Sequence, residues 1–377
     1  MDFRTGAGAG FRAAAISLWC LAAWASTPPA LAAQPDGPYV LRHAEGEWEA
    51  VSVDAGDASA VRRQRLSADA TITVPAVGTS PAFDVKLREP AAIAADTVVT
   101  AAGAEVFVVA DTHGEFDVLV RLLTAHRVIG PKLEWKFRRG HLVMLGDVFD
   151  RGPNQLEILW LLYKLEAEAR AAGGGVHLVL GNHEMMVLRG DLRYLHPKYT
   201  GTTHALGVSD YAALFAPDTL LGQWLRSKPA VMRIDDLLCL HGGISRAVLD
   251  STLTLKEIND TARAALDARV EQRSAMQELV LGSLGPMWYR GYFPAHRDFP
   301  VASPEDVDLT LKTFEARRIL IGHTIVPTVT PLFGGKVIAV QVNPKQELGQ
   351  PPRFEGLIIR NGAPFRATLD GKAAPLR

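Results

Sequence analysis

Residues 106–114 read VFVVADTHG, a short apolar run that ends directly in two potential metal ligands, Asp111 and His113. Four later segments repeat this arrangement. LVMLG at 142–146 precedes Asp147, HLVLG at 177–181 precedes Asn182 and His183, LLCL at 237–240 precedes His241, and ILIG at 319–322 precedes His323. Continuous apolar runs of this length are typical of strands covered on both faces, so we expect five interior strands of an α/β sandwich.

The segment between the second and third runs predicts a helix. Leu156, Leu159, Leu162 and Leu165 recur every three residues, which predicts an amphipathic helix ended by the glycines at 173–175. A single Asp or His after a strand is more often a turn residue than a ligand. Open α/β sheets, however, place their sites outside the carboxyl ends of the strands, so five such ends should converge on one crevice.

The residue types at these strand ends indicate a class of metal. Two Asp, one Asn and three His combine hard oxygens with imidazoles, a set that suits Mn, Fe or Zn better than Ca or a structural zinc. Six ligands are too many for one open catalytic ion, but a bridging carboxylate would let them hold two divalent or trivalent ions ~3.5–4 Å apart. Such a pair polarises a phosphoryl oxygen and activates a water, which predicts hydrolysis of a phosphate ester.

Other catalytic signatures are missing from the sequence. It contains no GxSxG nucleophile elbow, and the GGK at 334–336 lacks the spacing of a P-loop. Cys239 lies inside an apolar run and is interpreted as a packing residue. The histidines without a strand-end position are interpreted as surface or satisfied core residues: His43, His126, His141, His177, His196, His204 and His296.

The composition is that of an ordinary globular protein. The 377 residues are 48% hydrophobic and 21% charged, which allows two domains or one large domain with an extension. Lys and Arg number 40 against 41 Asp and Glu, for a net charge of -1. Proteins that neutralise many nucleic-acid phosphates are normally basic, so we expect no nucleic-acid partner. The residues point to no particular oligomeric state.

Residues 1–33 have the pattern of a signal peptide. Arg4 and Arg12 precede an uncharged apolar stretch at 13–25, and ALA at 30–32 provides a cleavage site of the small-x-small type. This stretch is shorter than the ~20 residues that span a bilayer, so we expect no membrane span after cleavage, with an uncleaved anchor as the alternative. The product should be periplasmic or secreted. Cleavage would remove Cys20 and leave Cys239 without a disulfide partner.

The remaining chain divides into two parts. Residues 34–103 contain short alternating segments, such as 70–74 and 83–87, and predict a small β-rich N-terminal extension without a catalytic cluster. Residues 104–377 form the catalytic domain, in which 185–231 and 255–280 are helical cap insertions that wall the cleft. Two sets of residues in these insertions carry expectations. Leu255, Ile258, Ala262, Leu266 and Val270 should pack, whereas Arg189, Arg193, Lys198 and Tyr199 either contact substrate or form a solvated face.

Five motifs in order resemble those of the calcineurin-like metallophosphoesterases. They are DTHG at 111–114, GDVFDRG at 146–152, GNHE at 181–184, HGG at 241–243 and GH at 322–323. The DRG ending resembles the phosphoprotein phosphatase branch. GDLRY at 190–194, PKY at 197–199 and WYRGY at 288–292 further resemble the Shewanella-like protein phosphatases. The resemblance covers residues 105 to about 345, so the N-terminal extension lies outside the match. Ala110 replaces a Gly that often opens the first motif.

The resemblance implies a metallophosphoesterase-type β-sandwich flanked by helices, with a role for each matched residue. Asp111 and His113 would bind one metal, Asp147 would bridge, and Asn182, His241 and His323 would bind the second. His183 would be the general acid, oriented by Asp150, and Arg151 and Arg290 would clamp the phosphoryl oxygens. Arg151 also follows Asp147 by four residues at the same strand end, whereas Arg290 rests mainly on the resemblance.

Three functions stay open at this point. The resemblance implies a dinuclear phosphatase acting on phosphomonoesters of a phosphorylated protein, with a preference for phosphotyrosine. A nucleotide or dinucleoside polyphosphate hydrolase could use every one of the same ligands. A metal- or phosphate-binding module without turnover is the third, but it would need neither His183, Asp150 nor the two arginines.

Overall fold

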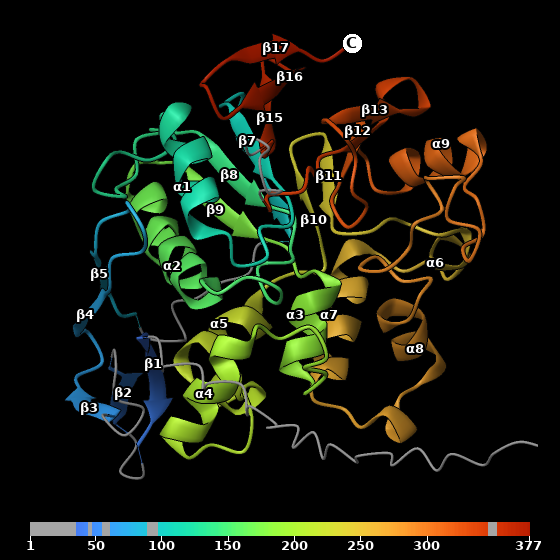
Figure 1. The fold of residues 1–377 in the computed structure, drawn as a ribbon. Helices are drawn as coiled ribbons and strands as arrows, with labels where there is room; N and C mark the ends of the chain where they lie inside the picture. The colour runs from blue at the N-terminus through green and yellow to red at the C-terminus, as the bar shows by residue number, and fades with distance from the viewer. Residues whose placement is uncertain (1–34, 44–46, 55–60, 89–96, 346–352) are drawn as a thin grey trace, which may run out of the picture.

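The computed structural model describes residues 35–43, 47–54, 61–88, 97–345 and 353–377 (Figure 1). The expected signal at 1–33, with Cys20, lies outside these ranges. Within them, no helix has the length and apolar character needed to cross a membrane.

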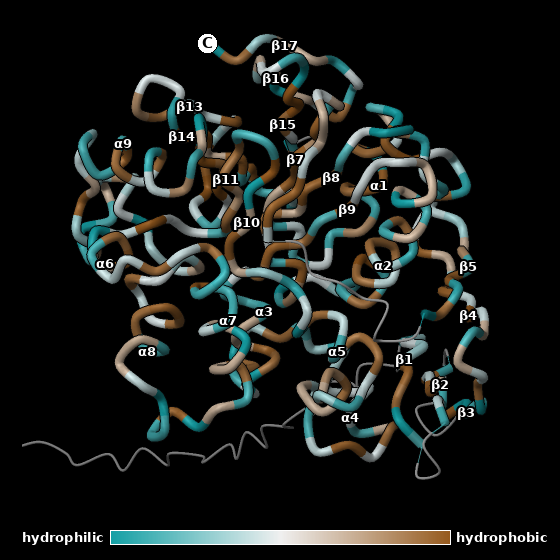
Figure 2. The backbone as a smooth tube through the Cα atoms, turned by 180° about the vertical axis from the view of Figure 1, so that it is seen from behind, coloured by the Kyte–Doolittle hydropathy of each residue, from teal (hydrophilic) through white to brown (hydrophobic). Residues whose placement is uncertain are grey.

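Two six-stranded sheets lie next to each other at the centre of the molecule, where the chain is most hydrophobic (Figures 1 and 2). The first has the order β17 (Ala373–Pro375), β16 (Ala363–Thr368), β15 (Glu355–Arg360), β7 (Val106–Val109), β8 (His141–Met144), β9 (Gly175–Leu178). The second has the order β13 (Thr330–Leu332), β14 (Val337–Ala339), β12 (Arg318–Ile321), β11 (Leu237–Leu240), β10 (Val231–Ile234), β6 (Val98–Val99). This arrangement confirms the expected α/β fold.

All five apolar runs contain a strand, and four of these strands are interior. The prediction was wrong for β9, which is the edge strand of the first sheet. Its run leaves the sheet early, because the N–H of Leu180 donates to the carbonyl of Pro229, 2.8 Å away, just before β10. The end of this run therefore connects the two sheets instead of gaining another strand neighbour.

Helix α2 (Gln155–Ala171) is buried on nearly every side over its first three turns. The four leucines are fully buried, but so are Trp160 and Tyr163 on other faces. The prediction of an amphipathic helix was therefore wrong. The reason is that the N-terminal extension covers the face that would otherwise meet water. The indole N–H of Trp160 donates to the carbonyl of Pro38 (2.9 Å), and Arg88 donates to the carbonyl of Tyr163 (2.8 Å). A helix that is apolar all round is a buried helix.

The extension is β-rich, as expected, and the strands of its own two sheets are antiparallel. It contains a three-stranded sheet of β1 (Asp36–Arg42), β2 (Trp48–Val53) and β3 (Val61–Leu66), and a hairpin of β4 (Thr71–Val74) and β5 (Phe83–Lys86). Strand β6 also falls within 34–103, but it pairs in parallel with β10 and so completes the second central sheet.

Further helices surround the sheets (Figure 1): α1 (Phe116–Ala125), α3 (Asn182–Leu188), α4 (Pro197–Leu206), α5 (Leu220–Ser227), α6 (Arg246–Asp250), α7 (Leu255–Leu266), α8 (Ala275–Leu281) and α9 (Pro304–Thr313). The expected helical stretch at 255–280 is two helices. A 3₁₀ turn at Val270–Gln272 separates them, and Ser274 caps α8 by accepting from the N–H of Gln277. Val270 is therefore 58% exposed, which contradicts its expected packing role.

Candidate metal centre

The predicted ligands come together at one edge of the two sheets. Asp111 and His113 follow β7, Asp147 follows β8, and His241 and His323 follow β11 and β12. Asn182 begins α3 and lies beside His241, with its Oδ1 2.9 Å from the imidazole Nε2. All six side chains are buried. The convergence expected from the strand ends is therefore observed.

The loops that carry these residues are strained. Positive φ angles occur at Asp111 (30°), His113 (43°), Asp147 (56°), Asp150 (69°), Arg151 (67°) and His323 (63°). Residues other than glycine seldom adopt this left-handed region, and such strain tends to collect at functional sites. Two glycines of the motifs cannot carry a larger side chain for a steric reason. A Cβ at Gly181 would overlap the carboxylate of Asp147, and one at Gly322 would overlap that of Asp111.

Three of the histidines are oriented by backbone carbonyls. His113 donates from Nδ1 to Phe149 (2.8 Å), His241 from Nδ1 to Leu145 (2.6 Å) and His323 from Nε2 to Trp288 (3.0 Å). Because a carbonyl can only accept, each ring must be protonated on that nitrogen, which leaves its other nitrogen as the one that could bind a metal. This is how metal-binding histidines are usually held.

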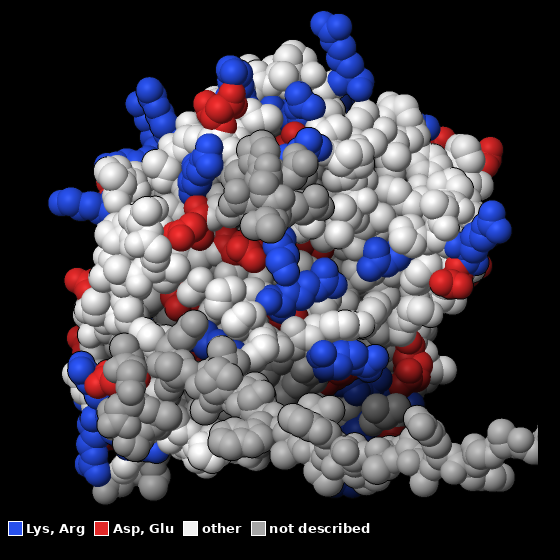
Figure 3. All heavy atoms as spheres, viewed as in Figure 1, with Lys and Arg blue, Asp and Glu red and all other residues white. Residues whose placement is uncertain are grey.

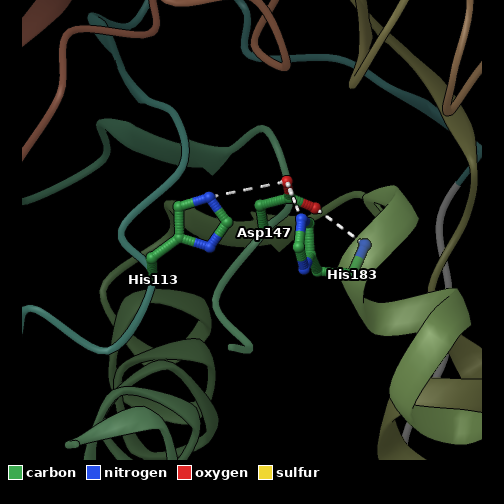
Figure 4. Close-up of side chains that lie close together, drawn as sticks. All are labelled: His113, Asp147 and His183. Carbon is green, nitrogen blue, oxygen red and sulfur yellow. Dashed lines mark hydrogen bonds and ion pairs between the residues drawn. The ribbon is translucent and has the colours of Figure 1, made fainter. Parts of the chain in front are cut away.

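Asp147 lies at the centre of two clusters that could each hold an ion. Its Oδ2 is 3.1 Å from Nε2 of His241, which with His323 completes one cluster. The same oxygen is 3.8 Å from Nε2 of His113 and 3.9 Å from Nε2 of His183, the other cluster (Figure 4). A carboxylate shared by two sites is what a bridging ligand requires.

Asp111 lies beside these clusters rather than within them. Its Oδ1 accepts the backbone N–H of His323 (3.1 Å) and is 4.0 Å from Nδ1 of His241. Burial raises the pKa of Asp111 to about 7, whereas His241 and His183 outweigh burial at Asp147 and hold its pKa well below the ordinary value. Two buried carboxylates that interact electrostatically favour a bound cation, and together with the imidazoles they fit a pair of metal ions.

His183 and Asp150 form a buried pair. Nδ1 of His183 is 2.6 Å from Oδ2 of Asp150, so Nε2 is free to face the cavity. Burial lowers the pKa of His183, but the carboxylates of Asp147 and Asp150 outweigh it and the pKa is raised. Asn182 and His183 point in different directions because they are successive residues of α3, where side chains differ by about 100°.

A cavity of about 230 Å³ opens beside the two clusters, and both predicted arginines line it. Nη2 of Arg151 is 3.4 Å from Nε2 of His183. Arg290 donates from Nη1 to the carbonyl of His323 (2.6 Å) and to the hydroxyl of Thr324 (3.1 Å). On the face of the molecule shown in Figure 3, basic side chains gather around the centre. The cavity is therefore suited to a phosphate group.

Three residues at the site were given no role from the sequence. Glu184, in the GNHE motif, is buried and accepts the backbone N–H groups of Asp147 (2.7 Å) and Gly181 (2.8 Å); a Glu three residues after a helix N-cap is its signal. Tyr194 places its ring 5.4 Å from that of His183. His296, interpreted from the sequence as a surface or core residue, is partly exposed and lines the cavity. It follows no strand, and the sequence carries no signal for it.

Lys198 and Tyr199 neither contact the cavity nor form a solvated face. Tyr199 is fully buried, and the Lys198 side chain is 3% exposed. Both donate to the carbonyl of Pro153, which stands two residues after Arg151. Arg193 is exposed and pairs with Asp191 at 2.6 Å, in agreement with the solvated alternative.

The chain is similar to several known proteins. The profile of the calcineurin-like phosphoesterase family matches residues 104–327. A solved structure of a cold-active protein-tyrosine phosphatase from a psychrophilic Shewanella species has a TM-score of 0.81 and 34% identity, and the match covers 91% of this chain and 100% of that one. Shewanella-like protein phosphatase 1 of Plasmodium berghei is 26% identical over 59% of this chain and 62% of its own length.

Two other relatives match parts of the chain. An uncharacterized protein of Schizosaccharomyces pombe is 30% identical over 58% of this chain and 66% of its own length. The symmetrical bis(5'-nucleosyl)-tetraphosphatase of Vibrio cholerae is 31% identical over 37% of this chain and 44% of its own length. The chain thus spans less than two thirds of the length of these curated relatives. The family profile nevertheless covers more than half of the chain, which belongs to the calcineurin-like phosphoesterase family.

Proposed function

We propose that this protein is a two-metal phosphatase that hydrolyses phosphomonoesters on proteins, with a preference for phosphotyrosine. The observation that carries the proposal is the His183–Asp150 pair, at 2.6 Å, beside two clusters that share Asp147. Two arginines line the same cavity. Metal binding alone would need neither the pair nor the arginines, so we favour an enzyme over a binding module without turnover.

The chemistry divides between the ions and the side chains. When bound, the two ions, which we propose to be Mn or an Fe/Zn pair, supply Lewis-acid polarisation of the phosphoryl group and activation of the attacking water. Arg151 and Arg290 hold the phosphoryl oxygens and stabilise the charge that develops on them. His183 donates its Nε2 proton to the leaving oxygen, and Asp150 keeps the ring in the orientation for that transfer.

The preference for phosphotyrosine has support from two exposed side chains, one in the cavity lining and one beside His183. Ile325 lines the cavity and is 55% exposed, and Tyr194, beside His183, is 48% exposed. Side chains of this kind can pack against the ring of a tyrosyl phosphate, whereas phosphoserine offers a single methylene. The likeness to the Shewanella tyrosine phosphatase supports the same preference.

A dinucleoside polyphosphate hydrolase is the second candidate, supported by the Vibrio relative. Its substrate would use the same ligands, and a nucleobase could stack on Tyr194. A competition between a phosphotyrosine peptide and diadenosine tetraphosphate for the metal-loaded protein separates the two. We expect the peptide to be turned over preferentially. Preferential cleavage of the dinucleotide would replace the proposal, and two bound ions without any turnover would favour the binding module.

Variants of Tyr194 test the substrate preference itself. Tyr194→Ala should lower kcat/KM for a phosphotyrosine peptide by about 2- to 10-fold, because an aromatic pair contributes roughly 0.5–1.5 kcal/mol. Tyr194→Phe keeps the ring and should retain activity. Leu309→Ala, at a 40% exposed apolar residue of α9 outside the cavity, is the matched control. Equal losses on phosphoserine and phosphotyrosine peptides would remove Tyr194 as a source of the preference.

A further inference from the structure

Strand β1 of the extension brings a buried carboxylate to the catalytic domain. Asp36 accepts from the hydroxyls of Tyr39 and Thr202, both at 2.7 Å, and its Oδ1 is 3.0 Å from Nζ of Lys198. Asp36 is 3% exposed and lies against α4, which supplies Lys198 and Thr202. Buried ion pairs seldom add net stability, since desolvation offsets the attraction. The pair therefore calls for a role besides stability.

Lys198 connects this pair to the loop that follows β8. Its Nζ also donates to the carbonyl of Pro153 (3.0 Å) and is 3.6 Å from the carboxylate of Glu157. The neighbouring Tyr199 donates its hydroxyl to the same carbonyl (2.7 Å) and accepts the N–H of Gln155 (2.9 Å). Residues 153–155 are thus held by two adjacent side chains of α4.

Arg151 lies just before this anchored segment. Its N–H donates to the carbonyl of Tyr194 (3.0 Å), in the chain leading into α4. Arg151 and Asp150 have φ angles of 67° and 69°, a conformation that persists only when the surroundings hold it. The segment from Tyr194 to Tyr199 therefore fixes the backbone on both sides of Arg151.

An aromatic cluster ties β1 to the same loop by a second route. Tyr39 meets Tyr211 and Phe215 edge-on, with ring centroids 6.4 and 6.1 Å apart. Phe215 in turn meets Phe149 at 4.9 Å. The carbonyl of Phe149 is the one that orients His113. Strand β1 thus supports the loop at Phe149 and, through Lys198, at Pro153.

We propose that the N-terminal extension is part of the catalytic apparatus, and that Asp36 and Lys198 are positioning residues that act through Arg151. Asp36 neutralises the buried Lys198, Lys198 holds Pro153, and Pro153 sets the direction of Arg151 toward the cavity. The inference rests on the proposed function, because it needs Arg151 to contact the phosphoryl group. It assigns a role to a region in which the sequence shows no catalytic residue.

The test compares two buried ion pairs. Lys228 and Glu166 form a pair at 3.1 Å that is as buried as Asp36–Lys198 but contacts neither the loop at 150–155 nor the cavity. The single variants Asp36→Asn and Lys198→Met should each lower kcat toward p-nitrophenyl phosphate at least tenfold, with a smaller change in KM. The reason is that a shift of ~1 Å in a catalytic group, here Arg151, can cost ~10² in rate. Lys228→Met should lose comparable stability in urea and keep kcat within twofold. Similar kcat losses in all three variants would overturn the proposal.

A double-mutant cycle separates positioning from general destabilisation. If Lys198 acts through Arg151, Lys198→Met should cost less than a further twofold in kcat when Arg151 is already Ala. Losses that multiply would overturn the proposal. Removing both charges, in Asp36→Asn with Lys198→Met, should restore stability without restoring kcat, because Pro153 keeps the Tyr199 donor but still lacks the one from Lys198. Recovery of both together would also count against it.

The proposed function and this inference fail in different ways. A wild-type protein with two bound ions that hydrolyses no phosphoester refutes the function. A crystal structure of Lys198→Met then decides the positioning by itself. Movement of the backbone at Arg151–Pro153 relative to His183 supports the inference, and an unchanged loop overturns it.

Discussion

The sharpest prediction concerns His183, because the structure offers it two roles. Its Nε2 is 3.9 Å from Asp147 and belongs to a cluster that could hold an ion, yet its Nδ1 is bound to Asp150 in the way that orients a proton donor. A ligand and a general acid respond differently to substitution. If His183 is the acid, His183→Asn keeps both ions and loses rate in proportion to how much the leaving group needs a proton.

The size of the effect follows from the pair. General-acid assistance contributes ~10² to 10⁴ in rate, or roughly 2.7–5.5 kcal/mol of the barrier, and we expect a loss of this size on phosphoserine peptides. The loss on p-nitrophenyl phosphate, with its acidic leaving group, should stay below ~10-fold. Asp150→Asn removes a charged acceptor worth ~1.5–3 kcal/mol, so it should show the same ordering with losses of about 10- to 100-fold.

The assay combines metal analysis with kcat/KM on phosphoserine, phosphotyrosine and p-nitrophenyl substrates, all well below the unfolding temperature. His296→Asn is the control, because His296 lines the same cavity but should show no dependence on the leaving group. Loss of an ion from His183→Asn would make His183 a ligand. Equal losses on every substrate would make it a structural residue, and either result would refute the reasoning.

Three further predictions follow from the same structure. Asp147→Asn should abolish turnover and release at least one ion, because a neutral amide cannot replace a shared carboxylate, and elemental analysis of the purified variant checks this. The exported protein should begin near Ala33 or Gln34 and lack Cys20, which N-terminal sequencing tests against a cytosolic product that begins at Met1. Burial lowers the pKa of His177 to about 3, below its unfolded value, so the unfolded chain takes up the proton first and stability falls below pH ~6.5. Between pH 7 and pH 5 the free energy of unfolding of the wild type should fall by at most about 2 kcal/mol more than that of His177→Gln, as measured by urea unfolding at both pH values.

The site could be predicted because its residues lie next to the strands that define the fold. Each ligand follows a run whose burial the sequence already indicates, so local pattern and site coincide. The burial of α2 could also be predicted in part from the sequence, since Trp160 and Tyr163 interrupt the polar face that an amphipathic helix would need. The role of Lys198 was not readable. Its partner Asp36 lies in the extension, and a basic residue beside a tyrosine has the same local pattern on a solvated face.

The histidine orientations also link the candidate metal ligands to the two arginines of the proposed phosphate clamp. His113 donates to Phe149, in the loop of Arg151, and His323 donates to Trp288, two residues before Arg290. Arg290 returns a hydrogen bond to the carbonyl of His323. Each arginine therefore lies in a segment that is fixed by a candidate metal ligand from a different motif. We therefore expect an ion that orders His113 or His323 to limit the movement of the segment carrying Arg151 or Arg290 as well, which would couple metal binding to preorganisation of the proposed phosphate site.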